Sequence, residues 1–207
     1  MTLSAELWAG SADLAEQSLR SPLVQGVADG TLPREVFVGY VAQDAHFLLA
    51  FARAYALALA ASPDTPTLLA FADLVTGVRE ELRLHEAYAA RWGLTPEGVP
   101  PAAATLAYTD FLLTTAAQED LGTLCAAMTP CMRLYAHLGQ VLAAERAPHG
   151  PYAAWVEAYA DPDFEALART LEDLLDRHAT DGPGVRRAYR RAMELELGFF
   201  RAATDGT

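Results

Sequence analysis

The sequence predicts an all-α protein, folded as a single-domain helical bundle that spans residues 1–207. Apolar residues recur at the three- and four-residue spacing of amphipathic helices almost from end to end. No segment alternates as a half-buried strand does, and no repeat, low-complexity tract or linker divides the chain. A chain of 207 residues is long enough to bury one sizeable core, so we expect one domain.

Proline, glycine and capping residues delimit the helices of the N-terminal half. A first helix is expected over residues 2–20, and a short second helix over 22–30 after a Ser-Pro pair. Thr31 precedes a long helix over 33–61, which carries a proline in its first turn. A Ser-Pro-Asp break then separates it from another long helix over 66–92, closed by a glycine.

The C-terminal half begins after a connector over 95–101 that is rich in proline and glycine. A helix over 102–117 follows, and Asp120 is expected to cap the helix that carries Cys131. Three further helices, each preceded by proline or glycine turn signals, are expected over 152–159, 161–178 and 183–203.

Composition excludes several classes of function. All 15 basic residues are arginine, so Schiff-base chemistry on a lysine of this chain is excluded. The net charge of −12 argues against a nucleic-acid surface, and no apolar run reaches the ~18 residues of a membrane span. Cys125 and Cys131 lie six residues apart on opposite faces of one helix, which disfavours a disulfide between them. With no secretory signal in view at the N-terminus, these features favour a reduced, cytoplasmic protein.

The helix around Cys131 is the first candidate for chemistry. Cys131 and Tyr135 are four residues apart on its apolar face, and Pro130 predicts a kink or a loosened turn there. A thiol beside a phenol at such a place is a plausible nucleophile. The alternative is that Cys131 is an inert, buried small hydrophobe, as most buried cysteines are.

Two carboxylates interrupt the apolar faces of other helices. Asp44 lies in the middle of the apolar face of 33–61, and Glu196 lies on that of the last helix. Burying an unpaired carboxylate costs several kcal/mol, so each needs a partner or a role. Asp44 either binds a ligand or is a core aspartate that pairs with an arginine or caps a helix. Together with Cys131, the two carboxylates suggest an acid/base pair around a nucleophile.

Aromatic side chains on expected inner faces provide candidate walls for a pocket, although such stripes more often belong to a core. A competing interpretation uses Glu81, His85 and His46 as ligands of iron or haem. The chain lacks the paired Glu-x-x-His motifs of di-iron bundles, and a structural Glu81–His85 pair is favoured instead. The candidate wall residues are Phe47, Phe51, Tyr108, Tyr135 and Tyr159.

The ordered set of motifs resembles the TenA / thiaminase II family over nearly the whole chain. An N-terminal segment carries a Y-x-x-Q-D core at Tyr40, Gln43 and Asp44, and the closing segment is similar to E-x-x-F-W with Phe200 in place of tryptophan. In order, the motifs are LRSPLVQGVADGTLPREVFVGYVAQDAHFLLAFARAYA, ELRLHEAYAARWGL, AYTDFLL, AMTPCMRLYAHLG, PYAAWVEAYADPDF and MELELGFFRAA.

This resemblance implies a haem-oxygenase-like fold that works without haem, metal or other cofactor, usually as a homotetramer. It implies hydrolysis of 4-amino-5-aminomethyl-2-methylpyrimidine to the hydroxymethyl pyrimidine in thiamine salvage, with cleavage of thiamine in many members. Cys131 would be the nucleophile, Glu196 the acid/base and Asp44 the carboxylate that grips the pyrimidine. Tyr108, Tyr135 and Tyr159 match pocket tyrosines, whereas Phe47 stands where many members have tyrosine.

Two alternatives remain beside the cysteine hydrolase. One is a family member that binds a pyrimidine without this hydrolysis, and the other is a helical iron or haem oxidase. Which of the aminopyrimidine and thiamine is the preferred substrate stays open, as does the effect of Phe47.

Overall fold

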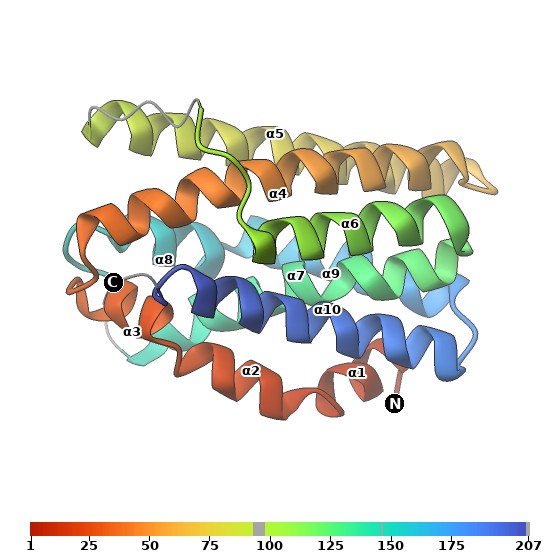
Figure 1. Cartoon of the computed structure of the whole chain (residues 1–207). Coiled ribbons are helices and arrows are strands. Elements are labelled where there is room, and N and C mark those ends of the chain that lie inside the picture. The colour runs from red at the N-terminus through yellow and green to blue at the C-terminus, as the bar shows by residue number, and fades with distance from the viewer. Residues whose placement is uncertain (93–97, 146, 206–207) are drawn as a thin grey trace.

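A computed structural model gives the structure of the chain, describing residues 1–92, 98–145 and 147–205, with residues 84–92 described by their backbone alone. The described residues form helices and no strand, which confirms the predicted class (Figure 1). The helices are α1 Leu3–Ala9, α2 Ala12–Leu19, α3 Pro22–Asp29, α4 Arg34–Ala60, α5 Thr65–Trp92, α6 Ala103–Gln118, α7 Leu121–Glu145, α8 Ala153–Ala160, α9 Pro162–His178 and α10 Pro183–Ala202.

The single first helix expected over 2–20 is wrong, because the chain breaks at Gly10 and Ser11 into α1 and α2. Gly10 ends α1 with its N–H donating to the carbonyl of Glu6, and Ser11 is buried at the start of α2. Glycine is unfavourable in the interior of a helix, which is consistent with a break at Gly10. The prediction rested on the spacing of apolar residues, and that spacing does not show the break. The other predicted helices agree with the structure to within two or three residues.

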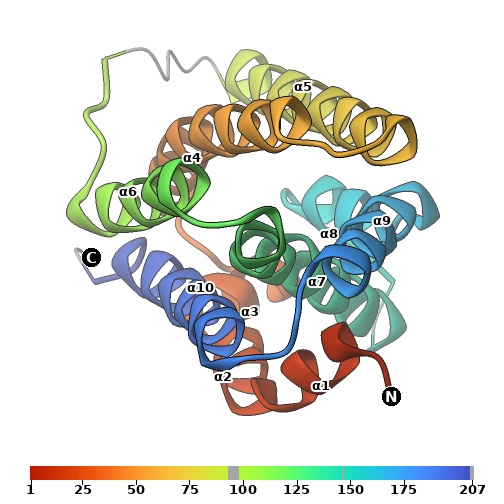
Figure 2. The ribbon, with the colours of Figure 1, turned by 90° about the vertical axis from the view of Figure 1, so that its right-hand side faces the viewer.

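Helix α7 lies at the centre of the bundle, where α4, α6, α8, α9 and α10 pack around it (Figure 2). Asp120 caps its N-terminus as predicted, with Oδ1 accepting the N–H of Thr123 at 2.7 Å. Pro130 does not interrupt it, since the chain is helical from Leu121 to Glu145. Nearly every residue of its middle turns is buried, so side chains on α7 face the core on all sides.

Two contacts fix α7 against its neighbours close to Cys131. Arg133 on α7 donates to Glu165 and Glu172 of α9, each at 2.7 Å, and these three side chains are largely buried. The second contact is the crossing of α8 over α7 at Gly139, where an added Cβ would overlap the backbone of Tyr159. Glycine is therefore needed at this crossing, which sets the position of Tyr159 relative to α7.

Helices α4 and α5 form an antiparallel pair on one side of α7 (Figure 1, Figure 2). The long apolar face of α4 packs on α5 and α6, whereas α5 has few contacts with α9. None of the described helices has the length and apolar character that crossing a membrane requires.

Candidate active site

A cavity of about 350 Å³ lies among α4, α5, α7, α8 and α9. Its volume is at the lower end of the range for small-molecule sites, and its walls are mainly apolar and aromatic. Six of the candidate site and wall residues that the sequence singled out line it: Asp44, Phe47, Phe51, Cys131, Tyr135 and Tyr159. Tyr108 and Glu196 lie directly behind this wall, as the contacts below show.

Cys131 and Glu196 form a hydrogen-bonded pair between α7 and α10. The Cys131 thiol donates a hydrogen bond to the Glu196 carboxyl. The Tyr108 hydroxyl also donates to this carboxyl, to Oε1 at 2.8 Å. Glu196 is only 1% exposed, and Cys131 is 8% exposed. The sequence placed these residues on three different helices, and the fold joins them into one buried cluster.

Burial raises the pKa of Glu196 from 4.5 to about 8, against the opposing hydrogen bonds from Tyr108 and Cys131. Burial also raises the pKa of the Cys131 thiol well above its usual value, and the charges of Glu196, Glu81 and Asp44 add to this effect. The resting site therefore holds a neutral thiol beside a carboxyl that titrates close to neutral pH. Such a carboxyl is suited to accept and return a proton.

Asp44 and Phe47 present a carboxylate and an aromatic face to the cavity from successive turns of α4. Asp44 is 3% exposed, and its charge raises the pKa of the Tyr135 and Tyr159 hydroxyls in addition to their burial. The Phe47 ring stacks on Phe51 with centroids 5.2 Å apart, and it lies 4.6 Å from the ring of Tyr108. A flat ring that offers hydrogen-bond donors at one edge fits such a wall.

A hydrogen-bonded row of aromatic side chains holds Tyr135. Trp155 Nε1 donates to the Tyr40 hydroxyl at 3.3 Å, and the Tyr40 and Tyr135 hydroxyls are 3.1 Å apart. The ring of Tyr135 meets that of Tyr159 edge-on at 4.7 Å. The orientation of the tyrosines that line the cavity is therefore fixed from behind.

Glu81 is a cavity residue that the sequence analysis did not include among the site candidates. It was interpreted as a structural partner of His85 or as an iron ligand, and the structure shows that it also lines the cavity and accepts the Tyr159 hydroxyl on Oε1 at 2.5 Å. The sequence contained a sign of this placement, because Glu81 follows Leu74 and Val78 at helical spacing on the inner face of α5. The His85 side chain lies outside the described residues.

The competing metal site receives no support from the described side chains. His46 Nε2 lies 2.7 Å from the carbonyl oxygen of Val99, in the connector before α6. Among the side chains that the structure describes, no three of histidine, cysteine, aspartate and glutamate come together as a metal site would require.

The second cysteine differs from Cys131 in its surroundings. Cys125 is fully buried in the core and is not among the described residues that line the cavity. Burial raises the pKa of its thiol to about 12. Both cysteines are free thiols.

The fold and the cavity define a haem-oxygenase-like helical bundle with a buried thiol–carboxyl pair at the wall of a cavity. The sequence profile of the TENA/THI-4/PQQC family matches residues 9–205. The chain belongs to this family.

Individual relatives agree with this assignment. An aminopyrimidine aminohydrolase of Halalkalibacterium halodurans is 34% identical over 86% of this chain and 83% of its own length. The bifunctional TH2 protein, mitochondrial, of Arabidopsis thaliana is 37% identical over 89% of this chain. This chain spans only 34% of the length of that protein, and 28% of a thiamine biosynthesis multifunctional protein ThiED of Corynebacterium efficiens.

Solved structures of similar proteins share the helical fold of this chain. A TenA family transcription regulator from Silicibacter sp. TM1040 has a TM-score of 0.89 and is 31% identical, with 96% of this chain and 95% of that chain covered. Heme oxygenase-1 from the cyanobacterium Synechocystis has a TM-score of 0.65 at 18% identity, over 100% of this chain and 94% of its own. The latter likeness concerns the fold alone.

Proposed function

We propose that this chain is an aminopyrimidine aminohydrolase of thiamine salvage that uses Cys131 as its nucleophile. Its reaction converts the aminomethyl pyrimidine and water into the hydroxymethyl pyrimidine and ammonia, and thiamine is a second substrate. The single observation that carries the proposal is the Cys131 thiol, bonded to the buried Glu196 carboxyl at the wall of a ring-sized cavity. Relatives named aminopyrimidine aminohydrolase support the reaction class.

Binding begins at Asp44 and Phe47. The Asp44 carboxylate accepts hydrogen bonds from the amino and protonated ring-nitrogen edge of the pyrimidine, and the Phe47 face packs on the ring. This pose brings a ring carbon to the Cys131 sulfur. Since Phe47 has no hydroxyl, it contributes to packing and not to hydrogen bonding.

The covalent step needs a base, because the Cys131 thiol is neutral at rest. Ionised Glu196 takes the thiol proton, the sulfur adds to the ring, and a proton goes to a ring nitrogen. With the ring no longer aromatic, electrons from that nitrogen expel the amine from the methylene carbon. Water then adds to the methylene carbon and gives up a proton. The Cys131 sulfur leaves the ring, which becomes aromatic again, and the sulfur is protonated back to the thiol.

Hydrolysis by the purified protein in a metal-chelating buffer tests this proposal. We expect hydroxymethyl pyrimidine from the aminomethyl pyrimidine and from thiamine, and their relative kcat/KM values give the preferred substrate. Binding without turnover would favour the non-hydrolysing family member. Stoichiometric iron or haem whose removal abolishes activity would favour the oxidase.

The family resemblance also supports a homotetramer in the cytoplasm as part of the proposal. Light scattering measures the assembly state, and the free thiols of both cysteines are those expected in a reducing compartment.

A further inference from the structure

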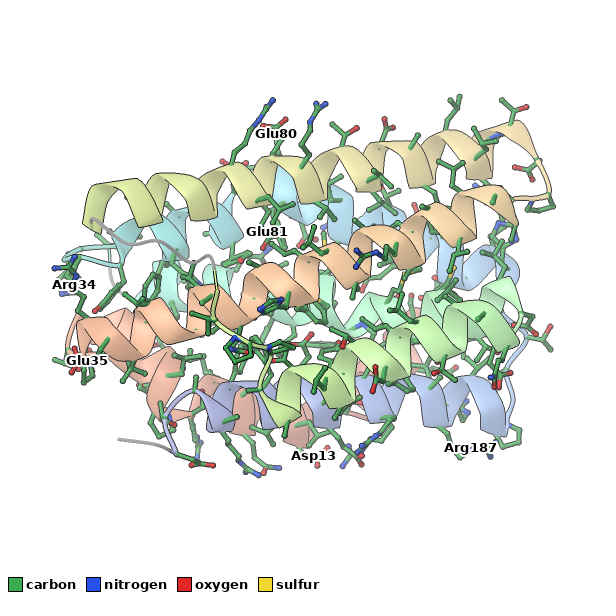
Figure 3. All side chains as sticks on the ribbon, turned by 45° about the horizontal axis from the view of Figure 1, so that its top comes forward. Asp13, Arg34, Glu35, Glu80, Glu81 and Arg187 are labelled. Atoms are coloured by element: carbon green, nitrogen blue, oxygen red, sulfur yellow. The ribbon has the colours of Figure 1, made fainter. Side chains whose placement is uncertain are left out.

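The cavity holds a carboxylate that the reaction above does not use. Glu81 comes from α5, on the side of the cavity opposite α7, and it is half-buried. Figure 3 shows Glu81 beneath α5, towards the interior of the bundle, whereas Glu80 points away from it. Tyr159 fixes the Glu81 carboxylate by donating to Oε1 at 2.5 Å.

The charges that the described residues bring to the cavity are of one sign. Among the residues that the structure describes there, five are acidic and none is basic. Asp161, Asp163 and Glu80 are exposed and lie at the outer part, and Glu80 is paired with Arg83 at 2.8 Å outside the cavity. Asp44 and Glu81 lie inside. A narrow site with this charge favours cations and disfavours phosphate groups.

The two inner carboxylates come from different helices. Asp44 comes from α4 beside Phe47, and Glu81 comes from α5 and bonds to Tyr159, while Cys131 comes from α7 and the charges of both carboxylates act on it. A pyrimidine held by Asp44 with its ring at Cys131 has its 5-methylene substituent directed to another part of the wall. Glu81 is the other carboxylate inside the cavity, on a different helix from Asp44.

We propose that Glu81 determines specificity by binding the positive charge of the leaving group, and that the acidic cavity rejects phosphorylated pyrimidines. This inference rests on the proposed function. The leaving group of the aminomethyl pyrimidine is an alkylammonium at neutral pH, and that of thiamine is a thiazolium cation. One carboxylate therefore serves both substrates, whereas the hydroxymethyl product is neutral and loses this interaction.

The charge balance of the reaction decides which kinetic constant Glu81 affects. When the carbon–nitrogen bond breaks, its electron pair stays on nitrogen, and the ammonium departs as neutral ammonia. The attraction to Glu81 is therefore strongest in the bound substrate and weakens towards the transition state. Removing the charge should raise KM and leave kcat unchanged or slightly higher.

Calorimetric binding to a Cys131→Ala background, which cannot turn over, tests the inference. The probes are the aminomethyl pyrimidine, the neutral hydroxymethyl pyrimidine and the phosphate ester of the latter. We expect Glu81→Gln to weaken binding of the cationic aminomethyl pyrimidine by about 10-fold or more. Binding of the neutral hydroxymethyl pyrimidine should weaken by less than about 2-fold. Asp73→Asn, which removes an exposed carboxylate of α5 outside the cavity, is the control with the same loss of charge, and it should leave both affinities unchanged. The phosphate ester should bind far more weakly than the neutral ligand.

Each other outcome overturns the inference. An equal loss for both ligands in Glu81→Gln would mean that Glu81 only positions Tyr159, and Tyr159→Phe would then give the same loss. An equal effect of Asp73→Asn on the cation would assign the preference to the general acidity of the surface. Should Glu81→Gln fail to fold, Glu81→Asp keeps the charge and must keep the preference for the cation.

The proposed function fails separately from this inference. A wild-type protein that hydrolyses the aminomethyl pyrimidine while Glu81→Gln leaves KM unchanged refutes the role of Glu81 alone. A wild-type protein without hydrolysis refutes the proposed function, whatever the binding data show.

Discussion

Glu196→Gln is the substitution whose effect on stability can be worked out most fully from the structure. Glutamine keeps the volume of the side chain and an oxygen that accepts the Tyr108 hydroxyl, but it cannot ionise. It therefore imitates the protonated form of Glu196 at every pH. The wild-type carboxyl has a pKa of about 8 in the folded protein and 4.5 without burial.

The sign of the effect follows from proton binding. Between pH 4.5 and about 8 the folded protein keeps the proton of Glu196, whereas the unfolded chain has lost it. The stability that this proton contributes is complete below pH 4.5 and declines as the pH rises to about 8. At about 1.4 kcal/mol per pH unit, the wild type loses about 5 kcal/mol over this window relative to the glutamine variant.

Urea unfolding at pH 5, 6, 7 and 8.5, followed by circular dichroism, measures this difference. Other titrating groups are common to both proteins and cancel when the two free energies are subtracted. We expect near-equal stability at pH 5 and a growing advantage of Glu196→Gln at higher pH. A difference that stays constant to within about 1 kcal/mol would refute the reasoning, since Glu196 would then ionise as readily in the folded as in the unfolded protein. In parallel, wild-type activity should rise towards pH 8 as Glu196 becomes a base, and the variant should have little activity.

Three further predictions concern the thiols, the pyrimidine edge and the crossing of α7 and α8. Cys131→Ser should fold yet lose nearly all turnover, because a hydroxyl is a much poorer nucleophile, whereas Cys125→Ala should cost about 1–2 kcal/mol of stability and keep its activity. Iodoacetamide should label Cys131 first, and a fully active Cys131→Ser would rule out covalent catalysis. Asp44→Asn should weaken pyrimidine binding by about 1–3 kcal/mol in calorimetry while the melting temperature changes little; normal binding by an unstable variant would make Asp44 purely structural. Gly139→Ala should destabilise the protein by more than about 2 kcal/mol, because its Cβ would overlap the backbone of α8. Gly198→Ala, which has open space around it, should stabilise α10 by about 0.5–1 kcal/mol in the same denaturation assay, so similar effects at the two sites would contradict the close crossing.

Most of the fold could be predicted because local signals specify a helical bundle. Apolar spacing and capping residues gave the long helices, as Asp120 illustrates at the start of α7. The break at Gly10 was missed because the apolar positions on either side of it continue in helical register. The two segments differ in their main packing partners, because α1 packs mainly against α9 and α2 mainly against α10.

The candidate site could be predicted only in part, for a related reason. Asp44 and Glu196 were recognisable because a charge inside an apolar stripe demands an explanation. Glu81 meets the same criterion, but its spacing from His85 also fits an ordinary pair on one helix face. Contacts such as Tyr108 with Glu196, 88 residues apart, depend on which helices pack together, and local spacing contains no such information.

The central place of α7 divides the molecule into regions of different local stability. Amides of the middle turns of α7, which five helices enclose, should exchange with solvent only when the whole protein unfolds. Helix α5 packs mainly on α4, so smaller fluctuations expose its amides on the cavity side. Cys131, the proposed nucleophile, should thus belong to the most persistent part of the protein, and Glu81 to a part that opens at lower free energy. On the proposed function, we expect a substrate to reach the thiol by fluctuations of the outer wall, without any loosening of the helix that carries Cys131.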